Sequence, residues 1–329
     1  MPFPYNVYLC AIVGAALMTS LTMPLWIAWC QRTGTVDDPG QRKIHSLPVP
    51  LGGGLAVMTG MVIPLLAGAL LLVLPTGWIF DSITIGLLKH GLGRRALELA
   101  GIVFGAFGML LLGFWDDRVE LKPGIKLLGQ FLIATVVAAT GVRISLFIPN
   151  LLFHYVITVL WIVTLVNALN FMDNMNGLCA GLGVIGACCF GLLSAGGGDY
   201  LVASIAFLVA GSLIGFLPWN FPNGKVFLGD AGSHLVGYLL AVLAVLPHFY
   251  SPRQSHPNEF KVLIPLLVLA VPLADLVSVV ILRWKIGQPF WVGDNNHLSH
   301  RLVRAGMTRS GAVMTIWIMA ALTGALAFL

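Results

Sequence analysis

Two adjacent carboxylates, Asp116 and Asp117, follow an apolar run that ends at Trp115. Because neighbouring carboxylates repel each other, the pair is costly unless a cation or a proton lies between them. A divalent metal site or a proton-transfer role would explain the pair. A charged helix end, with Arg118 as the ionic partner, is the alternative interpretation.

Amide and carboxylate side chains recur between two apolar stretches, at Asn167, Asn170, Asp173, Asn174 and Asn176. Positions 167, 170 and 173 share one face of a helix. Polar groups buried at a membrane boundary are costly without partners. A turn is the alternative, since Asn and Gly favour turns, but the three-residue spacing favours a functional site.

Asp230 lies among small residues, after Gly229 and before Gly232 and Ser233. Small residues at a helix start allow the backbone to approach a ligand closely, and the helix N-terminus offers N–H groups to an anion. An ordinary N-cap role for Asp230 is the alternative.

Two histidines three positions apart, His297 and His300, follow Asp294 and precede Arg301. This combination can grip a phosphate or a carboxylate. A basic loop beside anionic lipid is the alternative.

The segment from Asp37 to Gly54 carries Arg42, Lys43 and His45 ahead of a Pro- and Gly-rich stretch. Such a segment is typical of a phosphate or diphosphate binder, and equally of an ordinary loop. We expect its last part, from Pro48 to Gly54, to be a loop rather than a helix start.

Asp275 is the one acid inside an otherwise apolar helical stretch. An ionisable residue in that position indicates a function by default. A hydrogen bond between helices is the alternative.

The elements that position these residues follow from composition. The chain has 329 residues, of which 58% are hydrophobic and 9% are charged, whereas a soluble domain is about 25% charged. The sparse, scattered basic residues exclude a nucleic-acid-binding protein, and the apolar content excludes disorder. The five cysteines lie in apolar stretches and are interpreted as small hydrophobes, not as a disulfide framework. The fold expected is an all-α polytopic integral membrane protein with one transmembrane domain over residues 1–329.

Apolar intervals predict about ten transmembrane helices, since a crossing needs about 20 apolar residues. The intervals are 1–31, 44–80, 99–115, 127–142, 144–172, 174–198, 200–224, 231–252, 262–282 and 310–329. With ten spans, the loops after odd-numbered spans share one face, which holds twelve of the 18 Lys and Arg residues. The positive-inside bias therefore places that face in the cytoplasm. Apart from Asp275, which lies inside a span, the polar motifs described above fall on the same face, so we expect one shared site there.

Taken in chain order over residues 37–309, these segments resemble the polyprenyl-phosphate N-acetylhexosamine-1-phosphate transferases. The Arg42-Lys43-x-His45-x-x-Pro48-x-Pro50 loop resembles the transferases that start O-antigen and teichoic-acid synthesis more than it resembles phospho-N-acetylmuramoyl-pentapeptide transferase. The latter activity is kept as an alternative, as are a membrane transporter and an inactive scaffold.

The resemblance implies transfer of a sugar 1-phosphate from a UDP-sugar to undecaprenyl phosphate with release of UMP, by direct attack or through an aspartyl-phosphate. This would be the first membrane step of cell-wall or surface-polysaccharide synthesis, at the cytoplasmic side of the plasma (inner) membrane. The implied cofactor is Mg²⁺, with Mn²⁺ as the alternative. The implied partners are the two substrates and the lipid bilayer, with no nucleic acid, and a homodimer is left open.

The resemblance also assigns roles to residues. Asp116 and Asp117 match the acidic pair that handles the lipid phosphate and its proton. Asp173 matches a Mg²⁺ ligand, with Asp117 and Asp230 as further candidates, and is counted with the acidic pair as catalytic. The substrate-binding set comprises Arg42, Lys43, His45, Asn167, Asn170, Asn176, Asp230, His297, His300 and Arg301.

Three residues depart from the family pattern. Asn174 and Asn176 replace a Gly and a second Asp of the Asn-x-x-Asn-x-x-Asp-Gly-x-Asp-Gly motif. Ser299 replaces the middle His of the His-x-His-His motif. Asn176 keeps an oxygen but loses the charge, so the departures bear on the sugar and on Mg²⁺ affinity.

Overall fold

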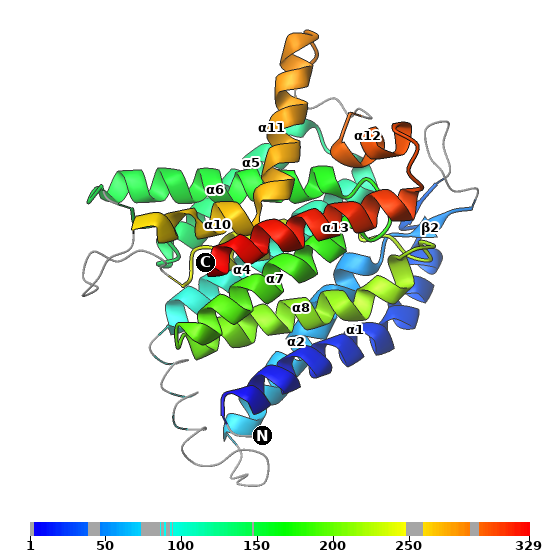
Figure 1. Ribbon diagram of the computed structural model, residues 1–329. Coiled ribbons are helices and arrows are strands. Elements are labelled where there is room, and N and C mark those ends of the chain that lie inside the picture. Colours follow the sequence, from blue (N-terminus) through cyan, green and yellow to red (C-terminus); the bar gives the residue numbers. More distant parts are fainter. Residues whose placement is uncertain are drawn as a thin grey trace.

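The computed structural model is a helical bundle that describes residues 3–38, 47–73, 86, 89, 93, 95–146, 148–247, 259–289 and 296–329 (Figure 1). Its longer helices are α1 (Tyr5–Thr33), α2 (Gly53–Val73), α4 (Ala96–Val119), α5 (Pro123–Ala139), α6 (Leu151–Met172), α7 (Leu178–Gly196), α8 (Tyr200–Asn220), α9 (Gly229–Leu243), α11 (Ala270–Lys285) and α13 (Arg309–Ala325). The shorter elements are α10 (Ile264–Val268), α12 (Leu298–Arg304), η1 (Glu259–Leu263) and η2 (Leu326–Phe328). Two short strands, β1 (Val36–Asp37) and β2 (Val49–Pro50), pair antiparallel.

Each of the ten apolar intervals contains a helix, and seven helices in the described part are long and apolar enough to cross a membrane. The chain is therefore an all-α, multi-pass membrane protein. The interval 262–282 differs from the single span expected, because it is bent by 70° between α10 and α11. Counting that pair as one span gives up to eight. The loop expected up to Gly54 ends earlier, since α2 begins at Gly53.

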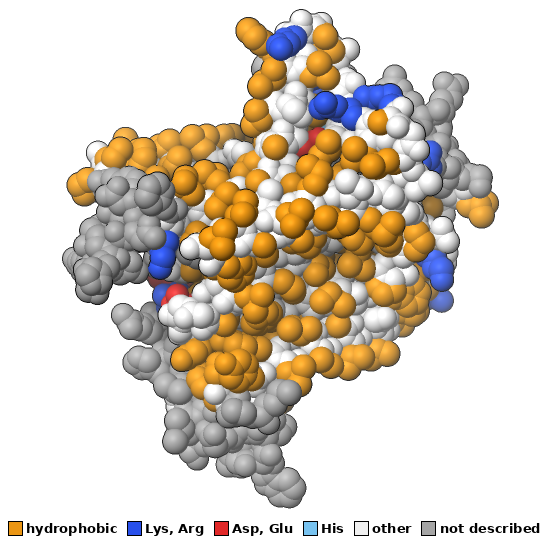
Figure 2. Space-filling model, in the orientation of Figure 1, with side chains coloured by type: hydrophobic (Ala, Val, Ile, Leu, Met, Phe, Trp, Pro, Cys, Tyr) orange, Lys and Arg blue, Asp and Glu red, His pale blue; other side chains and the backbone are white. Residues whose placement is uncertain are grey.

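Apolar side chains cover the outer face over α1, α7, α8 and α13, while the Lys and Arg side chains lie at its margins (Figure 2). On α1 the exposed residues recur every four positions, as in Leu9, Val13, Leu17 and Leu21. That spacing keeps one helix face turned outward. An apolar face of this kind suits lipid contact and explains the low charge of the sequence.

The centre of the bundle is α9, in which every residue except Asp230 is buried. It packs against α2, α4, α6 and α7. A helix that is buried all round belongs to the interior of a bundle, which explains why 15 residues suffice. The 17-residue α5 is also shorter than a full span.

Glycines allow α2 and α4 to approach α9 closely. A Cβ atom at Gly113 of α4 would collide with the backbone of Asp230 and Ala231, and one at Gly54 of α2 would collide with the backbone of Gly232. Neither neighbour is a flexible side chain, so neither contact can relax cheaply. The start of α9 is thereby held between two other helices.

Gly113→Ala is expected to destabilise the fold by ~1–3 kcal/mol, because the added methyl overpacks a backbone contact. Thermal unfolding in detergent measures the effect. Gly68→Ala in α2 is the matched control, since nothing lies within 4 Å of a Cβ atom there. Equal unfolding midpoints for the two variants would contradict the close packing of α4 on α9.

Candidate active site

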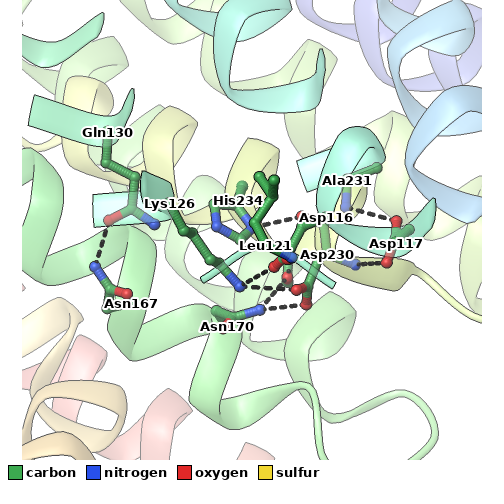
Figure 3. Close-up of polar contacts among 11 residues, drawn as sticks. Asp116, Asp117, Leu121, Lys126, Gln130, Asn167, Asn170, Asp230, Ala231 and His234 are labelled. Atoms are coloured by element: carbon green, nitrogen blue, oxygen red, sulfur yellow. Dashed lines mark hydrogen bonds and ion pairs between the residues drawn. The ribbon is translucent and has the colours of Figure 1, made fainter. Parts of the chain in front are cut away.

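Asp117, near the end of α4, binds the N-terminus of α9. Its Oδ1 accepts the backbone N–H of Asp230 at 2.7 Å, and its Oδ2 accepts the N–H of Ala231 at 3.0 Å (Figure 3). A carboxylate is stabilised by the free N–H groups and the dipole of a helix start. The N–H groups of this helix start that were expected to hold an anionic ligand therefore hold a carboxylate of the chain itself. Asp230 lies in the first turn and is not the N-cap, which is Leu228.

Lys126 of α5 joins two acids that come from different helices. Its Nζ lies 2.7 Å from Asp116 Oδ2 and 2.7 Å from Asp230 Oδ2 (Figure 3). Asp116 Oδ1 accepts the backbone N–H of Leu121 at 2.7 Å. A cation between the carboxylates offsets their repulsion. The structure thus brings together acids that are 114 positions apart in the sequence.

Arg118 is not the ionic partner of the acidic pair. Its guanidinium donates to Thr35 Oγ1 at 2.9 Å and lies 4.8 Å from the ring centroid of Phe114 and 5.5 Å from that of Trp29. The prediction that Arg118 is the ionic partner of the pair was therefore wrong. Asp116 pairs with Lys126, and Asp117 accepts backbone N–H groups of α9.

The two asparagines of α6 have different neighbours. Asn170 Nδ2 donates to Asp230 Oδ1 at 2.7 Å and to Ser233 Oγ at 2.9 Å, so it fixes the Asp230 carboxylate. Asn167, one turn away, donates to Gln130 Oε1 at 2.7 Å and does not contact the acids. Asn167 and Asn170 lie on one helix face, as their spacing predicted. Of the two, only Asn170 contacts a carboxylate.

Asp173 follows α6 and has a different environment. Within the part of the chain that the structure describes, its carboxylate has no hydrogen-bond or ion-pair partner. Burial, together with the charges of Asp230 and Asp117, raises the pKa of Asp173 well above its ordinary value. A cation would remove this cost, because it favours the ionised form. Asp173 is therefore the carboxylate here that is available to hold a metal ion.

The oxygen ligands near Asp173 suit Mg²⁺ that is bound together with a substrate. Within the described part of the chain, they do not suffice to surround a metal ion without a substrate. Among the described residues, no three His, Cys, Asp or Glu side chains form a ready metal site. The oxygens of Asp117 and Asp230 already accept hydrogen bonds or ion pairs. Mg²⁺ is commonly held by one or two carboxylates together with substrate phosphates. Asp173 can supply such a carboxylate oxygen.

The first turn of α12 carries the histidines and packs near Asp173. His297 is buried, and its ring lies 5.6 Å from that of Phe171, two residues before Asp173. His300 is half-buried, with its ring 6.4 Å from that of His297. The pKa of His300 is lowered from its ordinary value, mainly by burial and further by electrostatic interaction with His297, Arg304 and Arg309. Arg301 is exposed.

Asp275 of α11 forms hydrogen bonds to the start of α12. A hydrogen bond between helices was one of the two interpretations of this residue. Its Oδ2 lies 2.7 Å from His297 Nδ1, and its Oδ1 accepts the backbone N–H of Leu298 at 2.6 Å. Its partner is one of the candidate site residues, so the contact and a functional role are compatible.

Asn176 binds the loop between α8 and α9. Its Nδ2 donates to the carbonyl of Pro222 at 3.1 Å. Asn220 ties the same parts together, because it accepts from the N–H of Gly177 and donates to the carbonyl of Val226 at 2.8 Å. Arg42, Lys43, His45 and Asp294 lie outside the described residues.

Sequence reasoning missed Lys126 and Gln130 as members of the polar network. A signal existed for Lys126, which lies in the first turn of α5, where a cation opposes the helix dipole. Such a cation needs a carboxylate partner. Gln130, fully buried four positions later on the same face, is a polar residue in an apolar stretch and so carries a similar signal.

Lys126→Met is expected to destabilise the fold by about 1–3 kcal/mol, because it leaves two partly buried carboxylates facing each other without a cation. The matched control is Lys122→Met, since Lys122 is exposed one turn away. The unfolding midpoints of the two variants in detergent are compared. If both match the unsubstituted protein, the ion pairs of Lys126 contribute nothing to folding.

Comparison with known sequences shows which proteins the chain is similar to. The profile of glycosyl transferase family 4 matches residues 99–248. The chain is 31% identical over 317 residues to the "Probable undecaprenyl-phosphate N-acetylglucosaminyl 1-phosphate transferase" of Bacillus subtilis (strain 168), covering 94% of this chain and 81% of that protein.

Two more relatives are similar along most of the chain. The "Decaprenyl-phosphate N-acetylglucosaminephosphotransferase" of Mycobacterium tuberculosis (strain CDC 1551 / Oshkosh) is 32% identical, over 94% of this chain and 79% of that protein. The "Undecaprenyl-phosphate alpha-N-acetylglucosaminyl 1-phosphate transferase" of Escherichia coli (strain K12) is 24% identical, over 97% of this chain and 82% of that protein. With this extent of similarity, the chain belongs to glycosyl transferase family 4, among the polyprenyl-phosphate N-acetylhexosamine-1-phosphate transferases.

Proposed function

We propose that this enzyme transfers an N-acetylhexosamine 1-phosphate from a UDP-sugar to undecaprenyl phosphate and releases UMP. The observation that carries the proposal is the meeting of Asp116, Asp117 and Asp230 at one end of the bundle, next to the carboxylate of Asp173, which has no partner among the described residues. The relatives named above act on polyprenyl phosphates according to their names, and those names give the transporter alternative no support.

The chemical difficulty is that both substrates are anions. An oxygen of the lipid phosphate attacks the β-phosphorus of the UDP-sugar, a new P–O bond forms, and the bond to the UMP oxygen breaks. Asp173 would hold Mg²⁺, and the ion would neutralise charge on the diphosphate and on the departing UMP. The imidazoles of His297 and His300 and the guanidinium of Arg301 bind phosphate oxygens. Together these groups lower the repulsion between the reactants.

The acidic pair acts on the acceptor side. Asp117 keeps the lipid phosphate ionised for attack, with Asp116 and its partner Lys126 beside it. Both oxygens of Asp117 already accept backbone N–H groups. This engagement fixes the orientation of the carboxylate, and each of its oxygens keeps a lone pair that can accept the proton of the lipid phosphate.

The proposed setting is the plasma membrane, with the site at the cytoplasmic face and about ten helices crossing or entering the bilayer. The excess of Lys and Arg on the loops of that face supports this orientation. The site also lies at helix ends, where the phosphate of a lipid acceptor meets water while its chain stays among apolar side chains.

The test is UMP release by purified protein with Mg²⁺ or Mn²⁺, undecaprenyl phosphate and a panel of UDP-sugars. We expect UMP with at least one UDP-N-acetylhexosamine, and only when the lipid phosphate is present. UDP-N-acetylmuramoyl-pentapeptide in the panel tests the peptidoglycan alternative. Flux into vesicles without UMP would instead identify a transporter, and neither flux nor UMP a scaffold.

A further inference from the structure

Two of the three residues that depart from the family pattern, Asn174 and Ser299, bind each other. Ser299 Oγ donates to Asn174 Oδ1 at 2.6 Å, and Asn174 Nδ2 donates to the carbonyl of Phe171 at 2.6 Å. Ser299 is 0% exposed, so its hydroxyl relies on this partner. A glycine at 174 could not make the bond, and an imidazole at 299 would need space that the Asn174 side chain occupies. The two departures therefore depend on each other.

A second contact holds the same turn of α12 from the other side. The Asp275 side chain is 0% exposed, and it accepts from both His297 Nδ1 and the backbone N–H of Leu298. Because a carboxylate only accepts, Nδ1 of His297 must carry the proton, which leaves Nε2 for a ligand. The carboxylate therefore fixes the ring orientation of His297 and satisfies a free N–H at the helix start.

These contacts are needed because α12 has only seven residues, and helices shorter than about 12 residues are marginal on their own. Its first turn lies against residues 171–174. The ring of Phe171 packs on His297, with the Arg283 guanidinium 5.0 Å from the Phe171 centroid. The hydrogen bond to Asn174 places this turn next to Asp173.

We propose that Asn174, Ser299 and Asp275 are positioning residues that dock the first turn of α12 beside Asp173 and set where His297 and His300 meet the phosphates of the nucleotide sugar. The inference rests on the proposed function, because it takes those phosphates as the ligand of the histidines. It assigns a joint role to the pair at 174 and 299.

A double-mutant cycle tests the pair, with Asn174→Ala, Ser299→Ala and the double variant. Each single variant is expected to raise KM for the UDP-sugar about tenfold, the loss typical of a buried hydrogen bond. KM for undecaprenyl phosphate should stay within about twofold, because the acceptor side is independent. The double variant should be no worse than either single one. Multiplying losses, or equal changes in both KM values, would overturn the positioning role.

A reciprocal exchange gives a second, independent outcome. Asn174→Gly and Ser299→His are each expected to raise KM for the UDP-sugar. The combination should recover most of the loss, because the glycine vacates the space that the imidazole needs. A combination worse than both single variants would overturn the dependence between the two positions.

Asp275→Asn tests the second contact, and Ser212→Ala is the control. An amide can accept only one of the two N–H groups, so we expect KM for the UDP-sugar to rise by more than about tenfold. Ser212 is also 0% exposed, and among the described residues its hydroxyl bonds only within its own helix, so kinetics should not change. If Asp275→Asn fails to fold, the cycle at 174 and 299 still decides. No UMP from the unsubstituted protein would refute the proposed function, whereas active protein with unchanged variants would refute only this inference.

Discussion

Asp117→Asn is expected to lower the rate of UMP release by roughly 10³-fold, within the range that a misplaced acid–base group costs. The variant loses the charge that keeps the lipid phosphate ionised. It also turns an amide N–H toward the backbone N–H of Asp230 or Ala231, where Asp117 now accepts two hydrogen bonds. Two donors then face each other at the start of α9. A lower unfolding midpoint should therefore accompany the loss of turnover.

Two measurements separate these effects. Mg²⁺-dependent binding of the UDP-sugar, followed by calorimetry, should partly survive in Asp117→Asn, because Asp173 and the histidines are unchanged. Glu98→Gln is the control, since it neutralises an acid in the first turn of the same helix whose one ion pair among the described residues is with Arg95, at 4.0 Å. Its turnover should match that of the unsubstituted protein. Lost binding with unchanged turnover of bound substrate would refute the role of Asp117.

The convergence of the acids could be predicted because it depends on topology. Asp116, Asp173 and Asp230 each lie at one end of an apolar stretch, and counting spans places those ends on one face. The partners of the acids could not be predicted in the same way. Whether Asp117 meets Arg118, a metal or the backbone of α9 depends on how Gly113 lets two helices approach, and this is a property of packing.

The number of spans was harder to predict for a related reason. Hydropathy cannot distinguish a helix buried among other helices from a helix in lipid, since both are apolar. Hydropathy therefore predicted both α8 and α9 to be membrane spans, although α9 is shorter and enclosed by other helices. The break between α10 and α11 had a local signal in Pro265 and Pro272, but a 70° bend also needs a partner for the displaced helix. The displaced α11 packs against α6 and α13, and Asp275 links it to α12.

For Asp173 the expectation about stability is opposite to that for Asp117. Asp173→Asn should abolish measurable UMP release without lowering the unfolding midpoint. The side chain makes no hydrogen bond or ion pair among the described residues, and its charge is opposed by burial, by Asp230 and by Asp117. Removing the charge relieves that cost in the metal-free protein. Catalytic groups held at a cost to stability behave in this way when they are replaced.

The measurement is thermal unfolding with and without Mg²⁺ and UDP-sugar, alongside UMP release across a Mg²⁺ and Mn²⁺ series. A ligand that binds only the folded state raises the midpoint, so the unsubstituted protein should be stabilised when both are present. Asp173→Asn should lose that stabilisation, and higher metal concentrations should not restore turnover. Lys122→Met should keep both. If Mg²⁺ with the UDP-sugar still stabilises Asp173→Asn, the metal is bound elsewhere. That result would refute the proposal that Asp173 is a Mg²⁺ ligand.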